Sequence, residues 1–317
     1  MALKHIKLKI QSVKKTSTVT RAMEAVSAVK MRKAQERALV GRAYAAAALT
    51  ILERLSSTQE IQQHPLARLE GVQGLPLDGT RAALVRKACV VLITSDKGLA
   101  GALNSNVIRA TERDMSRCHL DMSNVVMIAL GRRGADYFTN RGYDVRARHE
   151  NVGDGISEDD MRFVTDKVLE LHASGEITSC LIAYMNFLST FEQKPAVRQI
   201  LPLTPELISE MVKGIVPAKG KYAGIGAGET HPSAYTIEPD VESIIEILMP
   251  RLLNIAVYHG LLEAKASEHS ARMVAMKSAT DKARDMAKML TRKFNKVRQA
   301  AITREVSEIT SGIEAMK

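Results

Sequence analysis

The most suggestive site in the sequence is the loop at residues 95–101, which reads SDKGLAG. It lies between an apolar run and a helical pattern, where backbone N–H groups can bind a phosphate. The loop lacks both the GxxxxGK(S/T) pattern of a nucleotide loop and the GxGxxG pattern of a dinucleotide site. Tight strand-to-helix turns also need glycine for their backbone angles, so a structural turn is the favoured interpretation and nucleotide binding the minor alternative. We therefore expect no cofactor.

Two further polar sets have spacings that suggest ligands. Residues 131–134 (GRRG) resemble an anion site at a helix start, although a turn with two exposed arginines is the simpler interpretation. His259 and His269 are ten residues apart, not the three or four that place two metal ligands on one helical face. We expect both histidines to be partly buried and hydrogen-bonded, and we expect no metal site.

Cysteine usage argues against a disulfide framework. The three cysteines are odd in number, far apart and outside any CxxC pattern: Cys89, Cys118 and Cys180. They indicate buried or free thiols in a reducing compartment. Serine and histidine occur in no motif that combines a nucleophile, a base and an orienting group. The sequence therefore predicts a protein that has no catalytic residues of its own.

The element that dominates the sequence is a helical pattern from Pro250 to the end of the chain. Apolar or small residues alternate in steps of four and three, as in a helix that stays packed along another helix. These seam residues are Leu252, Ile255, His259, Leu262, Ala266, His269, Met273, Met276, Thr280, Ala283, Ala287, Leu290, Phe294, Val297 and Ala301. At about 1.5 Å per residue, such a helix would be on the order of 100 Å long.

A second long helix is predicted from residue 2 to about residue 58, a stretch without proline. Its stripe is Ile6, Ile10, Val13, Ser17 and Thr20, and we expect Ala22, Val26 and Val29 to continue it. Two long helices at opposite ends of the chain, each with one narrow stripe, most simply pair antiparallel. The stripes are rich in Ala, Ser, Thr and Met, so we expect modest packing that benefits from an enclosing partner.

Between the two helices the pattern changes to that of an α/β domain. Apolar runs predict strands at 88–94, 124–130, 143–145 and 177–186, and helical patterns occur at 100–117 and 159–173. Continuous apolar strands that alternate with helices indicate a mostly parallel sheet. Clusters of Pro and Gly mark irregular segments on either side of this domain. We divide the chain into an N-terminal helix at 1–60, a linker at 61–80, the α/β domain at 81–212, a flexible insertion at 213–240 and a C-terminal helix at 241–317.

The net charge of +10 lies on the two terminal segments. Residues 1–60 hold 12 basic and 4 acidic side chains, residues 240–317 hold 13 and 10, and the remainder holds 20 and 21. The densest part is 282–304, with eight basic residues and one acidic residue. Such a run is a solvated helix face, a surface for an acidic protein or a nucleic-acid site. We find no signal peptide and no run of 18 to 20 apolar residues, and we expect no membrane-spanning helix.

Five motifs, in order along the chain, resemble the gamma subunit of the F-type ATP synthase, and the likeness covers essentially the full length. They are 10–24 (IQSVKKTSTVTRAME), 93–99 (ITSDKGL), 266–276 (ASEHSARMVAM), 294–303 (FNKVRQAAIT) and 302–308 (ITREVSE). The chain departs from the family pattern at Ala100, where cysteine is common, at Ile237, where an aromatic residue is common, and at Ile313, where alanine is usual.

The resemblance implies a long antiparallel coiled coil of the N- and C-terminal helices and a central Rossmann-like α/β domain with a mostly parallel sheet. It implies a non-catalytic rotor shaft that couples proton flow through a membrane ring to ATP synthesis or hydrolysis. The implied partners are three alpha and three beta subunits, the epsilon subunit and the c-ring, with one copy of this chain per complex. The implied location is peripheral, on the cytoplasmic side of the bacterial inner membrane, with membrane contact only through partner subunits.

The resemblance also carries site residues over to this sequence. The family's contacts with the alpha/beta ring match Met23, Arg272, Arg298, Gln299, Thr303 and Glu305. The segment at 213–240 also holds the foot that the family places on the c-ring, and its c-ring contacts match Tyr235 and Glu238. The alternative function is a basic coiled-coil protein that binds nucleic acid, although the basic segment has no interleaved aromatic residues. A third possibility, an enzyme that uses the α/β domain, would need a ligand at residues 95–101.

Overall fold

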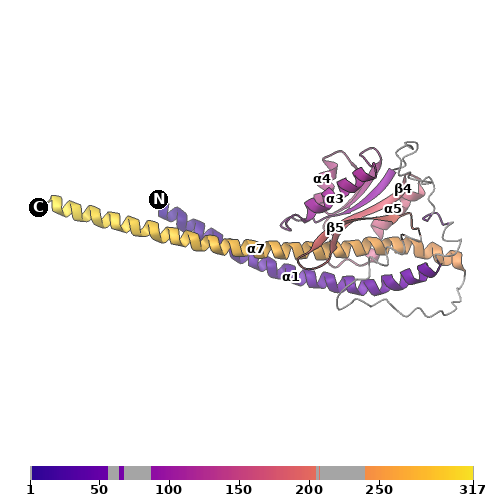
Figure 1. Cartoon of the computed structure of the whole chain (residues 1–317), viewed down its shortest axis with the longest axis horizontal. Helices are drawn as coiled ribbons and strands as arrows, with labels where there is room; N and C mark the ends of the chain where they lie inside the picture. Colours follow the sequence, from indigo (N-terminus) through magenta and orange to yellow (C-terminus); the bar gives the residue numbers. More distant parts are fainter. Residues whose placement is uncertain (1, 56–63, 68–86, 205–206, 208–239, 317) are drawn as a thin grey trace. The chain divides into compact units, whose positions relative to one another are not determined.

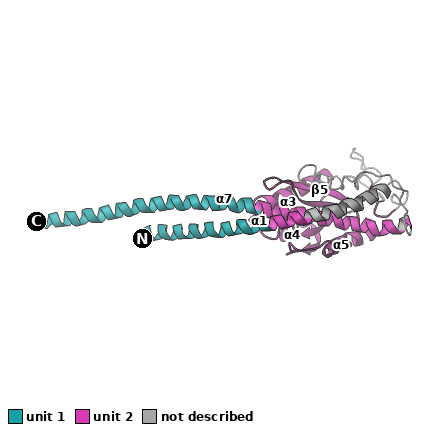
Figure 2. Ribbon diagram, turned by 90° about the horizontal axis from the view of Figure 1, so that it is seen from below, with its two compact units in different colours: residues 1–29, 272–317 teal, residues 30–271 magenta. Residues whose placement is uncertain are grey.

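The computed structural model describes residues 2–55, 64–67, 87–204, 207 and 240–316. The chain divides into two compact units, coloured separately in Figure 2. Unit 1 consists of Met1–Val29 and Arg272–Lys317, and unit 2 consists of Lys30–Ala271. Two long helices contribute to both units, α1 (Ala2–Leu55) and α7 (Val241–Ala315). All of the predicted insertion at 213–240 except Asp240, and most of the predicted linker at 61–80, lie outside the described residues, so the proposed domain division stays a prediction.

Unit 2 contains one five-stranded sheet with the order β3-β2-β1-β4-β5, of which Figure 1 labels the last two strands, β4 and β5. The strands are β1 (Lys87–Ile93), β2 (Val125–Leu130), β3 (Asp144–His149), β4 (Ile177–Phe187) and β5 (Gln193–Leu201). The first four are parallel, which confirms the mostly parallel sheet, and β5 pairs antiparallel with β4. No strand was expected at β5, because Pro195 and four charged or amide side chains interrupt its apolar pattern. Proline is tolerated on an edge strand, where one side of the ladder needs no donor.

Helices cover both faces of this sheet. The side chains of β1 alternate between them: Cys89, Val91 and Ile93 lie in the core under α5 (Arg162–Ala173) and α7, together with Val164 and Leu252. Val90 and Leu92 lie in a second core under α3 (Leu103–Arg117) and α4 (Arg132–Thr139). A strand buried on both faces explains the continuous apolar run that predicted it. α7 is therefore part of the α/β sandwich within unit 2.

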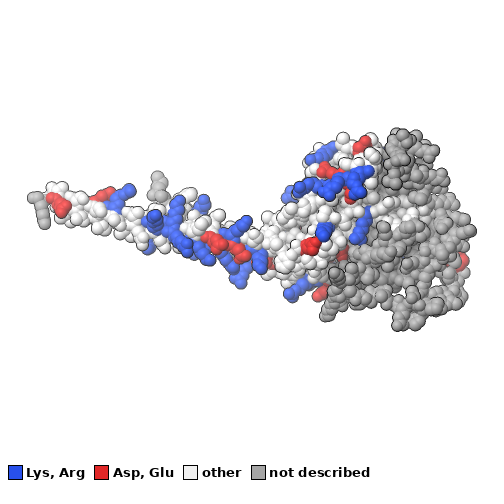
Figure 3. Space-filling model, in the orientation of Figure 1, with Lys and Arg blue, Asp and Glu red and all other residues white. Residues whose placement is uncertain are grey.

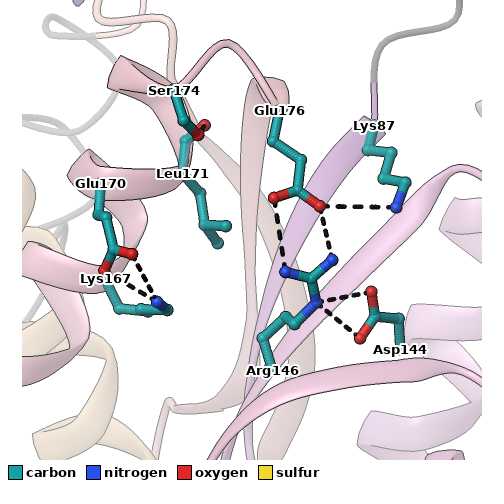
Figure 4. A network of polar contacts seen from close by, with 8 residues as sticks. All are labelled: Lys87, Asp144, Arg146, Lys167, Glu170, Leu171, Ser174 and Glu176. Atoms are coloured by element: carbon teal, nitrogen blue, oxygen red, sulfur yellow. Dashed lines mark hydrogen bonds and ion pairs between the residues drawn. The ribbon is translucent and has the colours of Figure 1, made fainter.

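An ion-pair network links strands across the amino ends of the sheet (Figure 4). The Arg146 Nε of β3 donates to both Asp144 oxygens at 2.8 and 2.7 Å, and its Nη2 donates to Glu176 Oε1 at 2.6 Å. Lys87 Nζ of β1 lies 3.5 Å from the same Glu176 oxygen. Isolated exposed pairs contribute little, but a forked arginine shared by two carboxylates is a favourable geometry. The network fixes the edge strand β3 to the turn that precedes β4.

Two features of α7 differ from expectation. Pro250, expected beside the start of the helix, lies inside it, ten residues beyond Asp240. A proline there removes one backbone hydrogen bond, and the buried residues around it, Met249 and Leu252, hold the helix through the interruption. By length and composition, an 18-residue window of this helix is also apolar enough to cross a membrane, with a mean hydropathy of 1.3. However, 56% of that window is buried inside the protein, as in a core helix.

The predicted seam of α7 is confirmed within unit 1. Every seam residue from Met273 to Ala301 is buried or half-buried, while nearly all residues between them are exposed. On α1, Ile6, Ile10, Val13, Ser17 and Thr20 are likewise buried or half-buried.

The continuation of the α1 stripe was predicted wrongly. Ala22, Val26 and Val29 are exposed, and Ser27 is buried instead. A step of seven from Thr20 reaches Ser27, so the phase of the helix decides burial and places the valines on the outer face.

Candidate partner-binding site

The two helices of unit 1 meet through small and hydroxyl-bearing side chains. The hydroxyls of Thr20 and Thr280 lie 2.7 Å apart and are buried. Nearby on the α7 seam, Ala283 and Ala287 are buried, and their side chains are small. Small residues allow the helix backbones to approach closely, but they bury little apolar area. The pairing therefore buries little apolar area, and the modest stability expected from the sequence stays a prediction.

A groove of about 750 Å³ runs between α1 and α7 in unit 1 and is strongly basic. Its walls are Lys14, Ser17, Thr18 and Arg21 of α1 and Arg284, Ala287, Lys288, Thr291 and Arg292 of α7. Five of these nine side chains are cationic and three carry hydroxyls. A concave surface that gathers cations from two helices attracts an acidic partner more strongly than either helix alone.

Carboxylates only partly offset this charge. Arg284 lies 3.7 Å from Asp281 and Lys288 lies 3.5 Å from Asp285, both pairs three residues apart on the helix surface. All four side chains are well exposed, so these pairs are weak and readily exchanged. In Figure 3, blue side chains outnumber red ones along the visible face of unit 1. The groove therefore keeps a net positive charge that a partner can neutralise.

The site residues that the resemblance implied fall at two levels of unit 1. Met23 of α1 and Arg272 of α7 are half-buried and lie within eight residues of the Thr20–Thr280 contact on their own helices. Arg298 lies 18 residues beyond Thr280, or about 27 Å along α7. The unit therefore presents one set of these residues near Arg272 and another toward its C-terminal end.

The second set is fully exposed and faces two directions. Arg298, Gln299, Thr303 and Glu305 are all exposed on α7. At about 100° per residue, Arg298 and Glu305 share one side of the helix, whereas Gln299 and Thr303 share a side roughly 120° away. A helix end that presents polar residues in two directions is suited to a partner that surrounds it. Tyr235 and Glu238 lie outside the described residues.

Two parts of this surface were missed in the sequence. Lys14, Thr18 and Arg21 recur at steps of four and three on α1, which was a usable signal for a basic stripe facing α7. The second part is an exposed apolar stripe near the end of α7: Ile302, Val306, Ile309 and Ile313. Its steps of four and three were also readable, but they are shifted by one residue from the seam that ends at Ala301. Exposed apolar stripes of this kind mark surfaces that a partner covers.

The loop at residues 95–101 is bonded to the protein itself. The Asp96 carboxylate accepts from the backbone N–H of Arg132 and of Asn151, each at 3.0 Å. Asn104 Nδ2 donates to the Ser95 hydroxyl at 2.8 Å. One carboxylate thus ties together the loops that follow β1, β2 and β3. In this arrangement the polar groups of the loop serve as structural links.

The turn at residues 131–134 has the same structural character. Gly131 has φ +98°, and a Cβ placed there would lie 2.1 Å from the Thr94 carbonyl oxygen. The Thr94 hydroxyl accepts from the Gly134 N–H at 2.9 Å. Arg132 and Arg133 are exposed, and the anion that meets the start of α4 is Asp96. The simpler interpretation of this segment, a turn with two exposed arginines, agrees with these contacts.

The two histidines contact carboxylates of the protein, and the three cysteines are free thiols. His259 Nε2 lies 3.6 Å from Glu263 Oε1, and His269 Nε2 lies 3.0 Å from Asp154 Oδ1, both histidines being buried rather than partly buried. Cys89 and Cys180 are buried and Cys118 is exposed, all as free thiols. Among the described residues, no group of three or more His, Cys, Asp or Glu side chains could hold a metal ion.

Comparison with known proteins gives one consistent family. The sequence model of a family described as ATP synthase matches residues 2–316. The ATP synthase gamma chain of Chloroherpeton thalassium is 36% identical, with 99% of this chain and 98% of the relative aligned. The ATP synthase gamma chain of Pelotomaculum thermopropionicum is 34% identical over 100% of this chain and 99% of its own length.

Solved structures agree on the fold. A chain of the Euglena gracilis mitochondrial ATP synthase OSCP/F1/c-ring structure in rotational state 3 has a TM-score of 0.62 and 18% identity, covering 99% of this chain and 94% of that one. A chain of the rotor of the same synthase in rotational state 1 has a TM-score of 0.59 and 16% identity, covering 95% and 99%. At such identities the likeness concerns the fold alone.

Proposed function

Because the chain belongs to the ATP synthase gamma-chain family, we propose that it is the central rotor shaft of an F-type ATP synthase. In this role it couples proton flow through a membrane ring of c subunits to ATP synthesis or hydrolysis in a ring of three alpha and three beta subunits. The observation that supports this best is the surface of unit 1, where a basic groove and an exposed apolar stripe are left for a partner to cover.

The mechanism follows from a difference in symmetry. One copy of an asymmetric shaft cannot make the same contacts with three identical sites, so each site is biased toward a different state and a different nucleotide affinity. Turning the shaft moves this bias from site to site, and nucleotide binding in turn biases the shaft angle. The chain needs no catalytic residue for this task, and we assign it a non-catalytic role.

The basic groove favours an acidic protein over nucleic acid as its partner. Single-stranded nucleic acid is usually held by aromatic side chains that stack on bases, beside a cationic groove. In unit 1 the sequence has one aromatic residue, Phe294, and it is half-buried on the seam. The groove offers cations and hydroxyls without a stacking surface. We infer that it meets acidic side chains of the surrounding ring.

The remaining assignments rest on the family. We assign contacts with the alpha/beta ring to Met23, Arg272, Arg298, Gln299, Thr303 and Glu305. We assign c-ring contacts to Tyr235 and Glu238, beside the epsilon subunit. The complex associates with the membrane, and we place this chain peripherally on the cytoplasmic side of the bacterial inner membrane.

Subunit stoichiometry tests the proposal directly. The complex purified through a tag on this chain should contain one copy for every three alpha and three beta subunits. The chain purified alone should hydrolyse no ATP. Robust ATP turnover by the isolated chain, or a purified assembly that lacks alpha and beta subunits, would contradict the proposed function.

A further inference from the structure

Within unit 2, α7 is held along one face by the segment at residues 150–158, which we call the strap. Four side chains of α7 hydrogen-bond to it, and a fifth, Arg251, places its Nε 3.9 Å from Glu158 Oε1. Asn254 Nδ2 donates to the Glu158 carbonyl at 2.9 Å, and the Tyr258 hydroxyl donates to the Ile156 carbonyl at 3.3 Å. Lys265 Nζ donates to the Val152 carbonyl at 2.8 Å, and His269 Nε2 lies 3.0 Å from Asp154 Oδ1. These four hydrogen bonds extend over 15 residues, or about 22 Å of helix.

A second row of polar contacts joins α7 to β4 and to the turn that follows it. Glu263 Oε2 accepts from the Phe187 N–H at 3.0 Å. The Ser267 hydroxyl donates to the Met185 carbonyl at 3.0 Å, and the Ser270 hydroxyl donates to the Thr190 carbonyl. All three side chains of α7 are buried, so these bonds are protected from water.

The two rows lie on opposite sides of the helix. At about 100° per residue, the four residues of the strap row, from Asn254 to His269, fall within about 60° of one another. The three residues of the sheet row, from Glu263 to Ser270, also span about 60°, centred roughly 160° from the middle of the first row. Directional contacts on two opposite sides resist rotation of a helix about its own axis.

The radius of the helix sets how far a given rotation displaces each contact. Side chains contact their neighbours at about 5 Å from the axis of a helix, so a turn of about 20° displaces each contact by about 1.7 Å. A displacement of that size breaks a hydrogen bond, whose strength depends on distance and angle. Apolar packing is non-directional and opposes such sliding less. The polar rows are therefore the contacts best suited to carry a twisting load.

Asp154 extends the strap row to the other long helix. Its Oδ2 lies 2.7 Å from Lys30 Nζ of α1, while its Oδ1 meets His269 of α7. Desolvation would raise the pKa of this carboxyl, but the bonds from Lys30 and His269, with Lys265 nearby, lower it to about 2. The side chain is therefore a carboxylate at neutral pH. Lys30 is the first residue of unit 2, and His269 lies two residues before its end at Ala271.

We propose that the two polar rows lock α7 to the sheet against rotation, and that Asp154 is a positioning residue that passes torque between both long helices and the α/β domain. The proposal rests on the proposed rotor function, because only a turning shaft loads these contacts. We assign Asp154 no role in nucleotide binding or in proton transport.

The test measures torsional stiffness in the assembled complex. The alpha/beta ring is fixed to a surface, and a nanorod is attached to Cys118, an exposed thiol of unit 2, while Cys89 and Cys180 are buried. Angular fluctuations of the rod are recorded at each catalytic pause. Asp154→Ala is compared with Asp154→Glu, which keeps the charge, and with Asp159→Ala. Asp159 is the matched control because its described ion pair, to Arg162, stays on the same surface turn.

We expect Asp154→Ala to raise the angular variance by about 1.2-fold to 1.3-fold, because one of the seven hydrogen bonds in the two rows is lost and a charge-assisted bond is about twice as strong as a neutral one. Asp154→Glu should restore most of the stiffness, and Asp159→Ala should match wild type. Lys30→Gln, an exposed change that leaves the core intact, should give a smaller increase. Equal variance in wild type and Asp154→Ala would overturn the proposal. A wild-type rod that never rotates with ATP would instead contradict the rotor function.

Discussion

Asp96 gives the loop at residues 95–101 a structural role, although the loop lies where a phosphate-binding loop would be found. Its two oxygens are both occupied by backbone N–H groups, from Arg132 and Asn151. In parallel α/β domains the carboxyl ends of the strands usually form a ligand crevice. Here the corresponding backbone donors are satisfied by a carboxylate of the chain. The loop residues thus hold the sheet end together, and the partner surface that we propose lies on the helices of unit 1.

Gly131 gives the sharpest prediction for a single residue. Gly131→Ala places a Cβ 2.1 Å from the Thr94 carbonyl oxygen, at a backbone φ of +98°. We expect a loss of at least about 2 kcal/mol in the free energy of unfolding, from left-handed strain together with the clash. Gly101→Ala is the matched control, since φ is +59° and no atom lies within 4 Å of the added Cβ. It should cost about 1 kcal/mol, from strain alone.

Urea unfolding of the isolated chain measures both variants. Both substitutions add the same atom at positive φ, so the loss beyond the Gly101→Ala value reports the Thr94 contact together with the extra backbone strain at the φ of +98° of Gly131. Equal losses for Gly131→Ala and Gly101→Ala would show that the turn relaxes away from β1 at no cost.

At the scale of elements, the phase of a helix proved more informative than the apolarity of its residues. The steps of four and three on α7 identified the buried face from Met273 to Ala301 correctly. On α1 the prediction followed Val26 and Val29, which are apolar but 56% exposed, and passed over Ser27, which is 2% exposed. A seam of small and hydroxyl-bearing residues has little contrast in hydrophobicity, so only its periodicity marks it. β5 escaped prediction for a related reason, because an edge strand that contains Pro195 carries no clear alternation.

The corrected phase of α1 can be tested with one glutamine on each surface. Val26→Gln should change the local stability of unit 1 by less than about 0.5 kcal/mol, because the side chain is on the outer face. Ala283→Gln, at a buried seam position, should cost more than about 1 kcal/mol by overpacking the helix contact. Hydrogen exchange of backbone amides near Thr280, in the full chain, reports the opening of this pair. If Val26→Gln lowered the local stability more than Ala283→Gln, the valines would belong to the buried seam and the corrected phase would be wrong.

For the whole molecule, the excess positive charge is concentrated at the terminal segments. The excess of basic residues lies on residues 1–60 and 240–317, and unit 1 arranges part of it as a groove between two helices. The sequence predicted the basic segment of α7 and the paired helices. It did not predict that α1 supplies Lys14 and Arg21 to the same groove, because that depends on how the two helices are aligned. The Thr20–Thr280 contact sets this alignment.

Charge reversal tests whether this basic surface couples the shaft to its ring. Lys296→Glu combined with Arg298→Glu replaces two exposed cations of α7 and changes the net charge by −4. Like charges that face each other at an interface repel, and each 1.4 kcal/mol lost corresponds to about a tenfold change, so ATP-driven proton pumping per ATP hydrolysed should fall by at least about tenfold. Thermal unfolding of the isolated chain should be nearly unchanged, since neither side chain is buried. Arg113→Glu combined with Arg117→Glu is the matched control, with the same charge change on exposed residues of α3. Normal pumping by the Lys296/Arg298 variant would show that this surface does not govern coupling. An equal loss in the control would show that total charge, rather than this surface, governs it.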